Sequence, residues 1–163
     1  MPETEAARLK VVILGCGRVG STLAKRLSQE GHTVTIIDMT GDAFRRLGTK
    51  YRGHKIVGTG LDQDTLNKAG LRTADVFFAV TQGDNTNIMA AQIAQEVFAT
   101  PRVLARIYDP IRAQAYREMG ITTLCTTTMA AAIMRAAALQ TPESAEWQPK
   151  LETWDKQYLQ EIG

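Results

Sequence analysis

The feature that most constrains the fold is a glycine-rich turn that directly follows a short apolar run. The run ends at Leu14, and the next six residues, GCGRVG at positions 15–20, have the spacing G-x-G-x-x-G and open an amphipathic stretch. In a strand–turn–helix unit, the first glycine permits a tight turn, the second lets the backbone approach a pyrophosphate, and the third allows close helix packing. Free N–H groups at the helix start attract an anion. The motif predicts a phosphate-binding turn at Gly15–Gly20.

Apolar, β-branched runs alternate with amphipathic stretches along most of the chain. This alternation is typical of strand–helix–strand units, in which helices cover both faces of a parallel sheet. It predicts an α/β fold with a doubly wound, Rossmann-like sheet of six parallel strands. The predicted strands are Leu9–Leu14, Thr33–Asp38, His54–Thr59, Asp75–Val80, Arg102–Ile107 and Ile121–Cys125. The predicted helices are Val19–Glu30, Asp42–Gly48, Asp62–Ala69, Asn85–Val97 and Pro110–Met119.

The sequence changes character after the last predicted strand. Thr126–Thr128 are candidate helix caps, and Met129–Leu139 consists almost wholly of Ala, Met, Ile and Leu. A helix that is apolar nearly all round is buried, often against another subunit when it leaves a finished domain. Prolines bracket a polar stretch at Gln140–Pro149, which predicts a linker. Apolar residues at helical spacing in 151–162 predict an amphipathic helix, which either docks on this subunit or its partner or begins a further domain.

Composition and cysteine spacing exclude several classes of protein. The chain has 19 Lys+Arg against 17 Asp+Glu, a balance that argues against a nucleic-acid partner and against a polybasic membrane-binding surface. Cys16 and Cys125 are too far apart for a CxxC pair, and His32 and His54 need carboxylates to hold a metal. No apolar run approaches the roughly 18 residues that span a bilayer. We therefore expect a cytoplasmic chain with no metal and no nucleic acid.

An acidic residue, Asp38, ends the second predicted strand at about the distance from the glycine turn where a ribose-binding carboxylate is expected. A carboxylate accepts hydrogen bonds from a ribose diol and repels a 2′-phosphate. The expected ligands are therefore NAD(H) or an adenosine phosphate such as ATP or ADP, and not NADP. The alternative is that Asp38 caps the following helix.

Ligands of open α/β sheets bind beyond the carboxyl ends of the strands, so the residues that end strands three and four are also candidates. Thr59 lies between two glycines that would let a flat base approach the backbone. Thr81 and Gln82 come first after strand four and are expected to face the cleft. For Asp84 and Asn85 we favour helix capping over ligand contact.

Two arginines are placed where a phosphate would explain them. Arg18 lies in the first turn of a predicted helix, where its positive charge opposes the helix dipole. Either a phosphate compensates this charge, or the side chain is simply solvated. Arg106 is a lone cation in an apolar run, so it should meet an acidic side chain or, as we favour, a phosphate. No catalytic base stands out: Cys16 is a small residue tolerated in a turn, and the Tyr51 and Lys55 spacing matches the short-chain dehydrogenases by chance, since no helix joins them.

These motifs resemble the RCK/KTN (TrkA N-terminal) domain family, the cytoplasmic regulators of potassium channels and transporters. The resemblance covers about Lys10 to Leu139 and includes VVILGCGRVG, TVTIIDM, IVGTGLDQDTLNKAGLRTADVFFAVTQGDNTNIMAAQIA and PRVLARIYDPIRAQAYREMGI. The middle segment is the specific part, because a generic Rossmann domain lacks this combination. The resemblance places the nucleotide contacts on Gly15, Cys16, Gly17, Arg18, Val19, Gly20, Asp38, Thr59, Thr81, Gln82 and Arg106, and implies no catalytic residue.

The resemblance also implies an organisation and a role. It divides the chain into a tail at 1–8, a nucleotide-binding domain at 9–139 that includes a crossover helix, and a linker with an amphipathic helix at 140–163. Family members form homodimers and rings on a membrane potassium channel or transporter, at the inner face of the cell membrane. Family members generally continue into a second ligand-binding domain, so the chain is expected to be a fragment or a single-domain member.

The main hypothesis is a non-enzymatic regulatory subunit in which a nucleotide gates a membrane partner through a conformational change. The ligand, NAD(H) or ATP/ADP, stays open because Asp38 suits both. The alternatives are the cofactor-binding domain of an NAD-dependent oxidoreductase or of a methyltransferase, and a purely structural oligomerisation module, which would leave the glycine turn, Asp38 and Arg106 without a shared reason.

Overall fold

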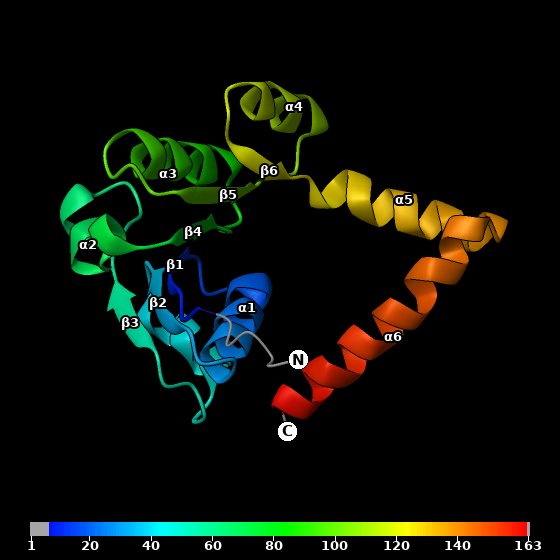
Figure 1. Ribbon diagram of the computed structural model, residues 1–163, viewed down its shortest axis with the longest axis horizontal. Helices are drawn as coiled ribbons and strands as arrows, with labels where there is room; N and C mark the ends of the chain where they lie inside the picture. Colours follow the sequence, from blue (N-terminus) through cyan, green and yellow to red (C-terminus); the bar gives the residue numbers. More distant parts are fainter. Residues whose placement is uncertain (1–6, 163) are drawn as a thin grey trace.

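All six predicted strands are present in one parallel sheet (Figure 1), in a computed structural model that describes residues 7–162. The strand order is β3-β2-β1-β4-β5-β6, so the chain moves outward from β1 in one direction and then in the other. This confirms the Rossmann-like, doubly wound α/β fold. The strands are β1 Lys10–Leu14, β2 Thr33–Asp38, β3 His54–Val57, β4 Val76–Ala79, β5 Arg102–Arg106 and β6 Thr122–Leu124.

The middle of the sheet is apolar because both of its faces are covered. In β1, Val11, Val12, Ile13 and Leu14 are all at most 3% exposed, as expected for a central parallel strand. Val11 pairs with residues of both β2 and β4. The carboxyl ends of β1, β2 and β4 therefore lie at one edge of the sheet.

Helices cover the two faces in the order that the connections require. On one face, α1 (Arg18–Gln29) and the 3₁₀ helix η1 (Gly41–Leu47) pack with a cluster that includes Ile13 and Ile36. On the other face, α2 (Gln63–Lys68) and α3 (Asp84–Glu96) pack with a cluster around Phe77. A second 3₁₀ helix, η2 (Leu71–Thr73), precedes β4, and α4 (Pro110–Glu118) lies beside β6.

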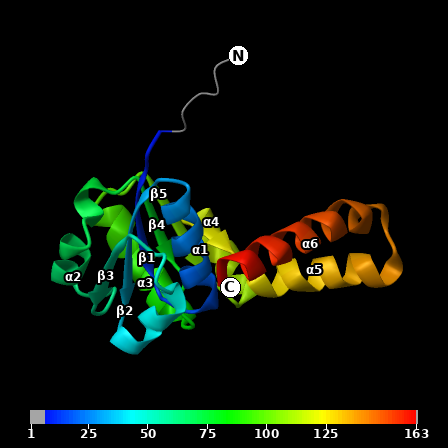
Figure 2. The same ribbon diagram turned by 90° about the horizontal axis from the view of Figure 1, so that it is seen from below.

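The last two helices form a hairpin that projects from this domain (Figures 1 and 2). Helix α5 (Thr126–Leu139) leads away from β6, and α6 (Pro142–Ile162) returns toward α1. There, Arg26 donates a hydrogen bond from Nη2 to Oε1 of Gln157 at 2.8 Å. No helix in the described part of the chain is long and apolar enough to cross a lipid bilayer.

The hairpin differs from the sequence expectations in two places. The predicted linker at 140–149 is wrong, because α6 begins at Pro142 and continues through Pro149. A proline is favoured in the first turn, where its missing N–H costs nothing, and this helix accommodates the second one in its interior. Thr126–Thr128 are the first turn of α5 rather than a cap, and Cys125 takes the N-cap position.

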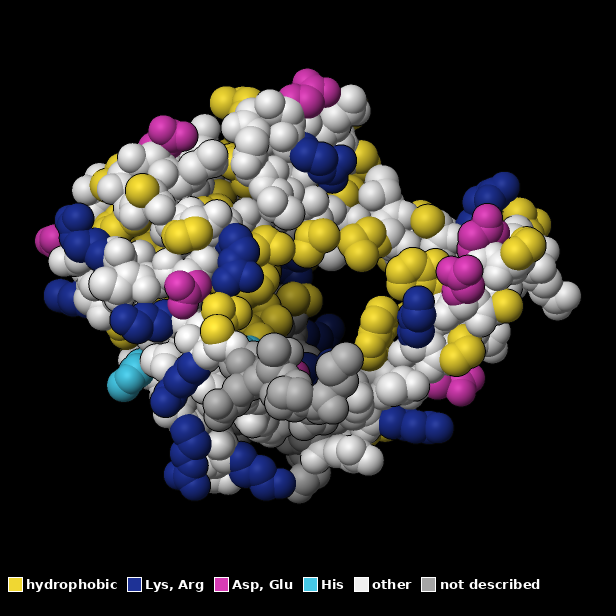
Figure 3. Space-filling view, in the orientation of Figure 1, with side chains coloured by type: hydrophobic (Ala, Val, Ile, Leu, Met, Phe, Trp, Pro, Cys, Tyr) yellow, Lys and Arg dark blue, Asp and Glu magenta, His cyan; other side chains and the backbone are white. Residues whose placement is uncertain are grey.

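The expected burial of α5 does not occur within one chain. Met129, Met134 and Leu139 are 49–72% exposed, and Figure 3 shows hydrophobic side chains along the hairpin facing an open space between it and the body of the domain. Burial against another subunit stays a prediction. Of the predicted tail, residues 1–6 lie outside the described residues, as do the side chains of Tyr158 and Ile162 in the predicted amphipathic helix.

Candidate nucleotide-binding site

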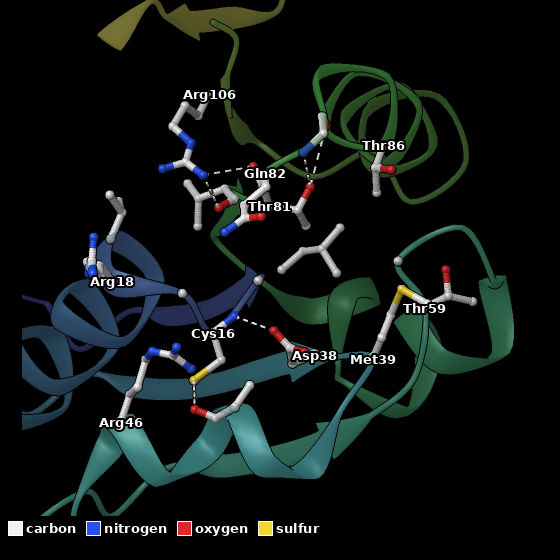
Figure 4. Close-up of a pocket in the computed structure, with 18 of the residues that line it drawn as sticks. Cys16, Arg18, Asp38, Met39, Arg46, Thr59, Thr81, Gln82, Thr86 and Arg106 are labelled. Carbon is white, nitrogen blue, oxygen red and sulfur yellow. Dashed lines mark hydrogen bonds between the residues drawn. The ribbon is translucent and has the colours of Figure 1, made fainter.

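A pocket of about 780 Å³ opens at the carboxyl ends of β1, β2, β4 and β5 (Figure 4). Every candidate residue predicted from the sequence lines it except Gly20, which is buried in the first turn of α1. Whether these residues contact a nucleotide stays a prediction. The candidates in the lining are Gly15, Cys16, Gly17, Arg18, Val19, Asp38, Thr59, Thr81, Gln82 and Arg106.

The glycine turn has the geometry that its spacing predicts. Gly15 has a φ of +103°, which favours glycine, and a Cβ at Gly20 would lie 1.8 Å from the carbonyl oxygen of Gly15. A Cβ at Gly17 would meet nothing within 4 Å, so the backbone there faces open space. Gly17 is also the N-cap of α1, with no capping side chain and no acidic residue in the first turn. The first N–H groups of α1 are therefore available to an anion.

The Asp38 carboxylate borders the turn and shapes it. Its Oδ2 accepts a hydrogen bond from the backbone N–H of Cys16 at 2.8 Å, and its Oδ1 accepts from the N–H and hydroxyl of Thr40 at 3.0 and 3.3 Å. Thr40, not Asp38, is the N-cap of η1, so the capping alternative is wrong. A carboxylate has about four lone-pair sites, which leaves acceptor capacity for a ribose hydroxyl.

Cys16 has no exposed surface. Its Sγ donates to the carbonyl oxygen of Ala43 at 3.4 Å. Burial, reinforced by the negative charge of Asp38, raises the pKa of the thiol to about 11. A thiol that stays protonated is a poor nucleophile, which agrees with a packing role for Cys16.

Arg106 reaches across the pocket from the end of β5, and its partners among the described residues are backbone oxygens and an aromatic ring rather than an acidic side chain. Its Nη2 donates to the carbonyl oxygens of Val80 at 3.0 Å and Thr81 at 2.8 Å. The guanidinium carbon lies 4.9 Å from the ring centroid of Tyr108. Nε is buried without a hydrogen-bond partner among the described residues. Backbone oxygens and an aromatic ring thus replace the acidic side chain, and a phosphate stays a prediction.

Sequence reasoning missed several lining residues. Arg46 on η1 reaches toward Cys16 and the glycine turn (Figure 4). Met39 follows directly after β2, and Tyr108 lies two residues after the end of β5. The available signal was a cation eight residues after Asp38, in a short helix that leads away from a ligand-binding strand end. The pocket lining thus contains one acidic residue and three arginines, Arg18, Arg46 and Arg106. This excess of positive charge favours an anionic ligand.

Asp84 and Asn85 do not cap α3, contrary to the prediction, because Gly83 is its N-cap. The Asp84 carboxylate instead accepts from the backbone N–H groups of Tyr108 and Asp109, at 2.8 and 3.1 Å. Asn85 accepts from Arg112. The first turn of α3 therefore holds the loop that follows β5.

Tyr51 and Lys55 are not arranged as a dehydrogenase pair. The Tyr51 hydroxyl is directed at backbone, where it donates to the carbonyl oxygen of Val34 at 3.1 Å. Burial raises the pKa of Tyr51 above its ordinary value. Neither residue lines the pocket.

Comparison with known proteins gives close relatives by sequence. The chain is 52% identical over 118 residues to the "Trk system potassium uptake protein TrkA" of Streptomyces coelicolor, a match that covers 72% of this chain and 53% of that protein. It is 42% identical to the protein of the same name from Vibrio alginolyticus, over 63% of this chain and 22% of that protein. The chain thus spans about half of the first relative and about a fifth of the second.

Solved structures share the fold at lower identity. The "Shewanella denitrificans Kef CTD in AMP bound form" aligns with a TM-score of 0.69 and 19% identity, over 91% of this chain and 92% of that one. The "GsuK channel bound to NAD" aligns with a TM-score of 0.61 and 17% identity, over 76% of this chain and 22% of that one. "GsuK bound to ADP" gives 0.61 and 16%, over 74% of this chain and 32% of that one.

The match to a family model settles the relationship. The model of the TrkA-N domain matches residues 11–127, which includes all six strands except Lys10 at the start of β1, the glycine turn and every lining residue of the pocket. The chain therefore belongs to the TrkA-N domain family.

Proposed function

We propose that this chain is a nucleotide-binding regulatory domain of a potassium uptake or channel system. The observation that carries the proposal is the pocket, in which the start of α1, the Asp38 carboxylate and three arginines surround one space. These groups suit the phosphates and the ribose of a nucleotide. The relatives named for Trk potassium uptake support the biological setting.

The ligand we propose is an adenine nucleotide, either NAD(H) or ATP/ADP. Asp38, Met39 and Thr59 lie on one side of the pocket, and the three arginines lie toward the other (Figure 4). We place the adenosine on the first side and the phosphates beside the glycine turn. The Asp38 carboxylate would repel a 2′-phosphate, which disfavours NADP. The AMP, ADP and NAD complexes of the structural neighbours support this class of ligand.

We propose regulation rather than catalysis because the lining offers poor groups for proton transfer. Cys16 is buried, and its pKa is raised to about 11. Both oxygens of Asp38 already accept hydrogen bonds from the chain. The alternative, a cofactor-binding domain of an NAD-dependent oxidoreductase, predicts hydride transfer to some small substrate, which a regulatory domain does not perform.

For partners we propose a second copy of the chain and a membrane potassium channel or transporter subunit. The exposed apolar residues of α5 are the surface we assign to the second copy. Nucleotide binding would then act by favouring one arrangement of the two copies over another, which requires a different affinity for each arrangement. The chain would work at the cytoplasmic face of the membrane and reach it through this partner.

Calorimetric titration with ADP, ATP, NAD⁺ and NADH tests the proposal. We expect at least one of them to bind, with loss of binding in Asp38→Ala. Asp42→Ala is the matched control, because Asp42 is an exposed carboxylate four residues away that pairs with Arg45. The proposal is wrong if none of the four nucleotides binds the folded protein at millimolar concentration. Mass spectrometry of copurified nucleotide would distinguish the two ligand classes.

A further inference from the structure

Asn87 lies outside the pocket lining, yet it contacts both segments that carry the polar wall opposite the glycine turn. It belongs to the first turn of α3, and its side chain has no exposed surface. Its Oδ1 accepts from the backbone N–H and the hydroxyl of Thr81, at 2.9 and 2.7 Å. Its Nδ2 donates to the carbonyl oxygens of Thr81 and Arg106, at 2.9 and 2.8 Å.

These four hydrogen bonds use the full capacity of an amide side chain, which has two N–H donors and two oxygen lone pairs. A buried polar network in which every member is satisfied is rigid, and it is costly to alter because each lost partner leaves a buried group unpaired. Asn87 therefore fixes the backbone and the side chain of Thr81 together.

The position of Asn87 explains why such a clamp is needed. The last paired residues of β4 and β5 are Ala79 and Ala105, so the two strands separate just before Thr81 and Arg106. Asn87 bridges the gap that the sheet ladder leaves. Arg106 closes a ring, since its Nη2 donates to the same Thr81 oxygen that Asn87 binds.

We propose that Asn87 is a positioning residue of the nucleotide site, which sets Thr81 and Arg106 at the spacing that the ligand requires without touching the ligand. The proposal rests on the proposed function, because it assigns Asn87 a role in nucleotide affinity rather than only in folding. If Asn87 has this role, the affinity for nucleotide should change with the hydrogen bonds that the side chain at position 87 can make.

Asn87→Asp tests this dependence, because pH changes the hydrogen bonds that an aspartate side chain can make. The ionised carboxylate keeps an acceptor for Thr81 but turns its second oxygen toward two carbonyl oxygens, which repel it. The protonated acid regains one donor, and burial raises the pKa of this carboxyl above its ordinary range. In ADP titrations of the full chain we expect binding about tenfold weaker than wild type at pH 8. The ratio to wild type, taken at each pH, should recover toward one at pH 5.5.

Asn85→Asp is the matched control, because it makes the same change two positions away on the exposed surface of the same helix. It should bind ADP within about twofold of wild type at both pH values. If folded Asn87→Asp matches wild type at both pH values, or if its deficit does not change with pH, the proposal is wrong.

Asn87→Ser covers the case in which the aspartate variant does not fold. We expect weaker ADP binding and faster hydrogen exchange at the Thr81 amide, which loses its Oδ1 acceptor. Wild-type affinity for ADP in this variant would overturn the positioning role. A wild-type protein that binds no nucleotide would instead defeat the proposed function, so the two failures are distinguishable.

Discussion

The Asp38 carboxylate and the backbone N–H of Cys16 are joined by a 2.8 Å hydrogen bond between residues 22 positions apart. Asp38 ends β2, and Cys16 lies inside the glycine turn, so the bond fixes the turn beside the carboxylate. One side chain thus has two roles: it shapes the phosphate-binding turn, and it borders the space for a ribose.

Asp38→Ala should therefore destabilise the protein even without ligand. The Cys16 amide would lose its acceptor, which costs about 1–3 kcal/mol for a buried N–H. Urea unfolding followed by circular dichroism measures the effect. Asp42→Ala should leave the midpoint unchanged, since Asp42 is exposed. Equal midpoints for wild type and Asp38→Ala would show that the turn holds its shape without the carboxylate.

The glycines at 17 and 20 should respond differently to alanine. A Cβ at Gly20 would lie 1.8 Å from a backbone oxygen, so Gly20→Ala should lower stability by about 3 kcal/mol or more. A Cβ at Gly17 meets nothing within 4 Å and projects into open space. Gly17→Ala should fold normally and lose ADP binding. Thermal unfolding and titration together check the pair; unaltered ADP affinity in Gly17→Ala would place the phosphates elsewhere.

Arg46 should contribute to affinity through charge. Arg46→Ala should weaken ADP binding roughly two- to fivefold, as for an exposed ion pair, with a smaller deficit at high salt. Arg45→Ala is the matched control, because Arg45 is the neighbouring arginine and forms an ion pair with Asp42. Titrations at low and high ionic strength test this. The same loss in both variants would mean that general surface charge, rather than the pocket, is responsible.

The Cys16 thiol should make stability fall at alkaline pH. Its pKa is about 11 in the folded protein against 9.0 for an ordinary thiol. A raised pKa favours folding below pH 9, and this contribution is lost as pH rises through 11. Between pH 8 and 11, wild type should therefore lose roughly 2–3 kcal/mol relative to Cys16→Ser. Urea unfolding of both proteins at each pH measures the difference, and parallel curves would contradict it.

The sequence predicted the sheet well because its signals are local and strong. Continuous apolar runs such as Val76–Ala79 require burial on both faces, and the glycine spacing fixes where β1 turns into α1. The same locality explains the failure at 140–149. Two prolines favour a loop, but Pro142 begins a helix and Pro149 lies inside that same helix. Only the packing of the hairpin decides this outcome.

Side-chain partners across the sheet were harder to predict. Asp84 looked like a cap because caps are the commonest use of an acidic residue before a helix, yet it binds backbone 24 residues away. Arg46 has only a weak local signal, its place in the short helix that follows Asp38, and Asn87 has none. Both depend on which strand ends the topology brings together, and that is known only once the sheet is assembled.

The exposed apolar residues of α5 allow a test of the proposed dimer. Met134 is 72% exposed on a helix that is nearly free of charge, so a charge placed there should oppose burial in a dimer. We expect wild type to sediment as a dimer and Met134→Glu to shift toward the monomer in sedimentation velocity. Met89→Glu is the control, because Met89 is 50% exposed on α3, away from the hairpin. A dimer that is unaffected by Met134→Glu would move the interface to another surface of the domain.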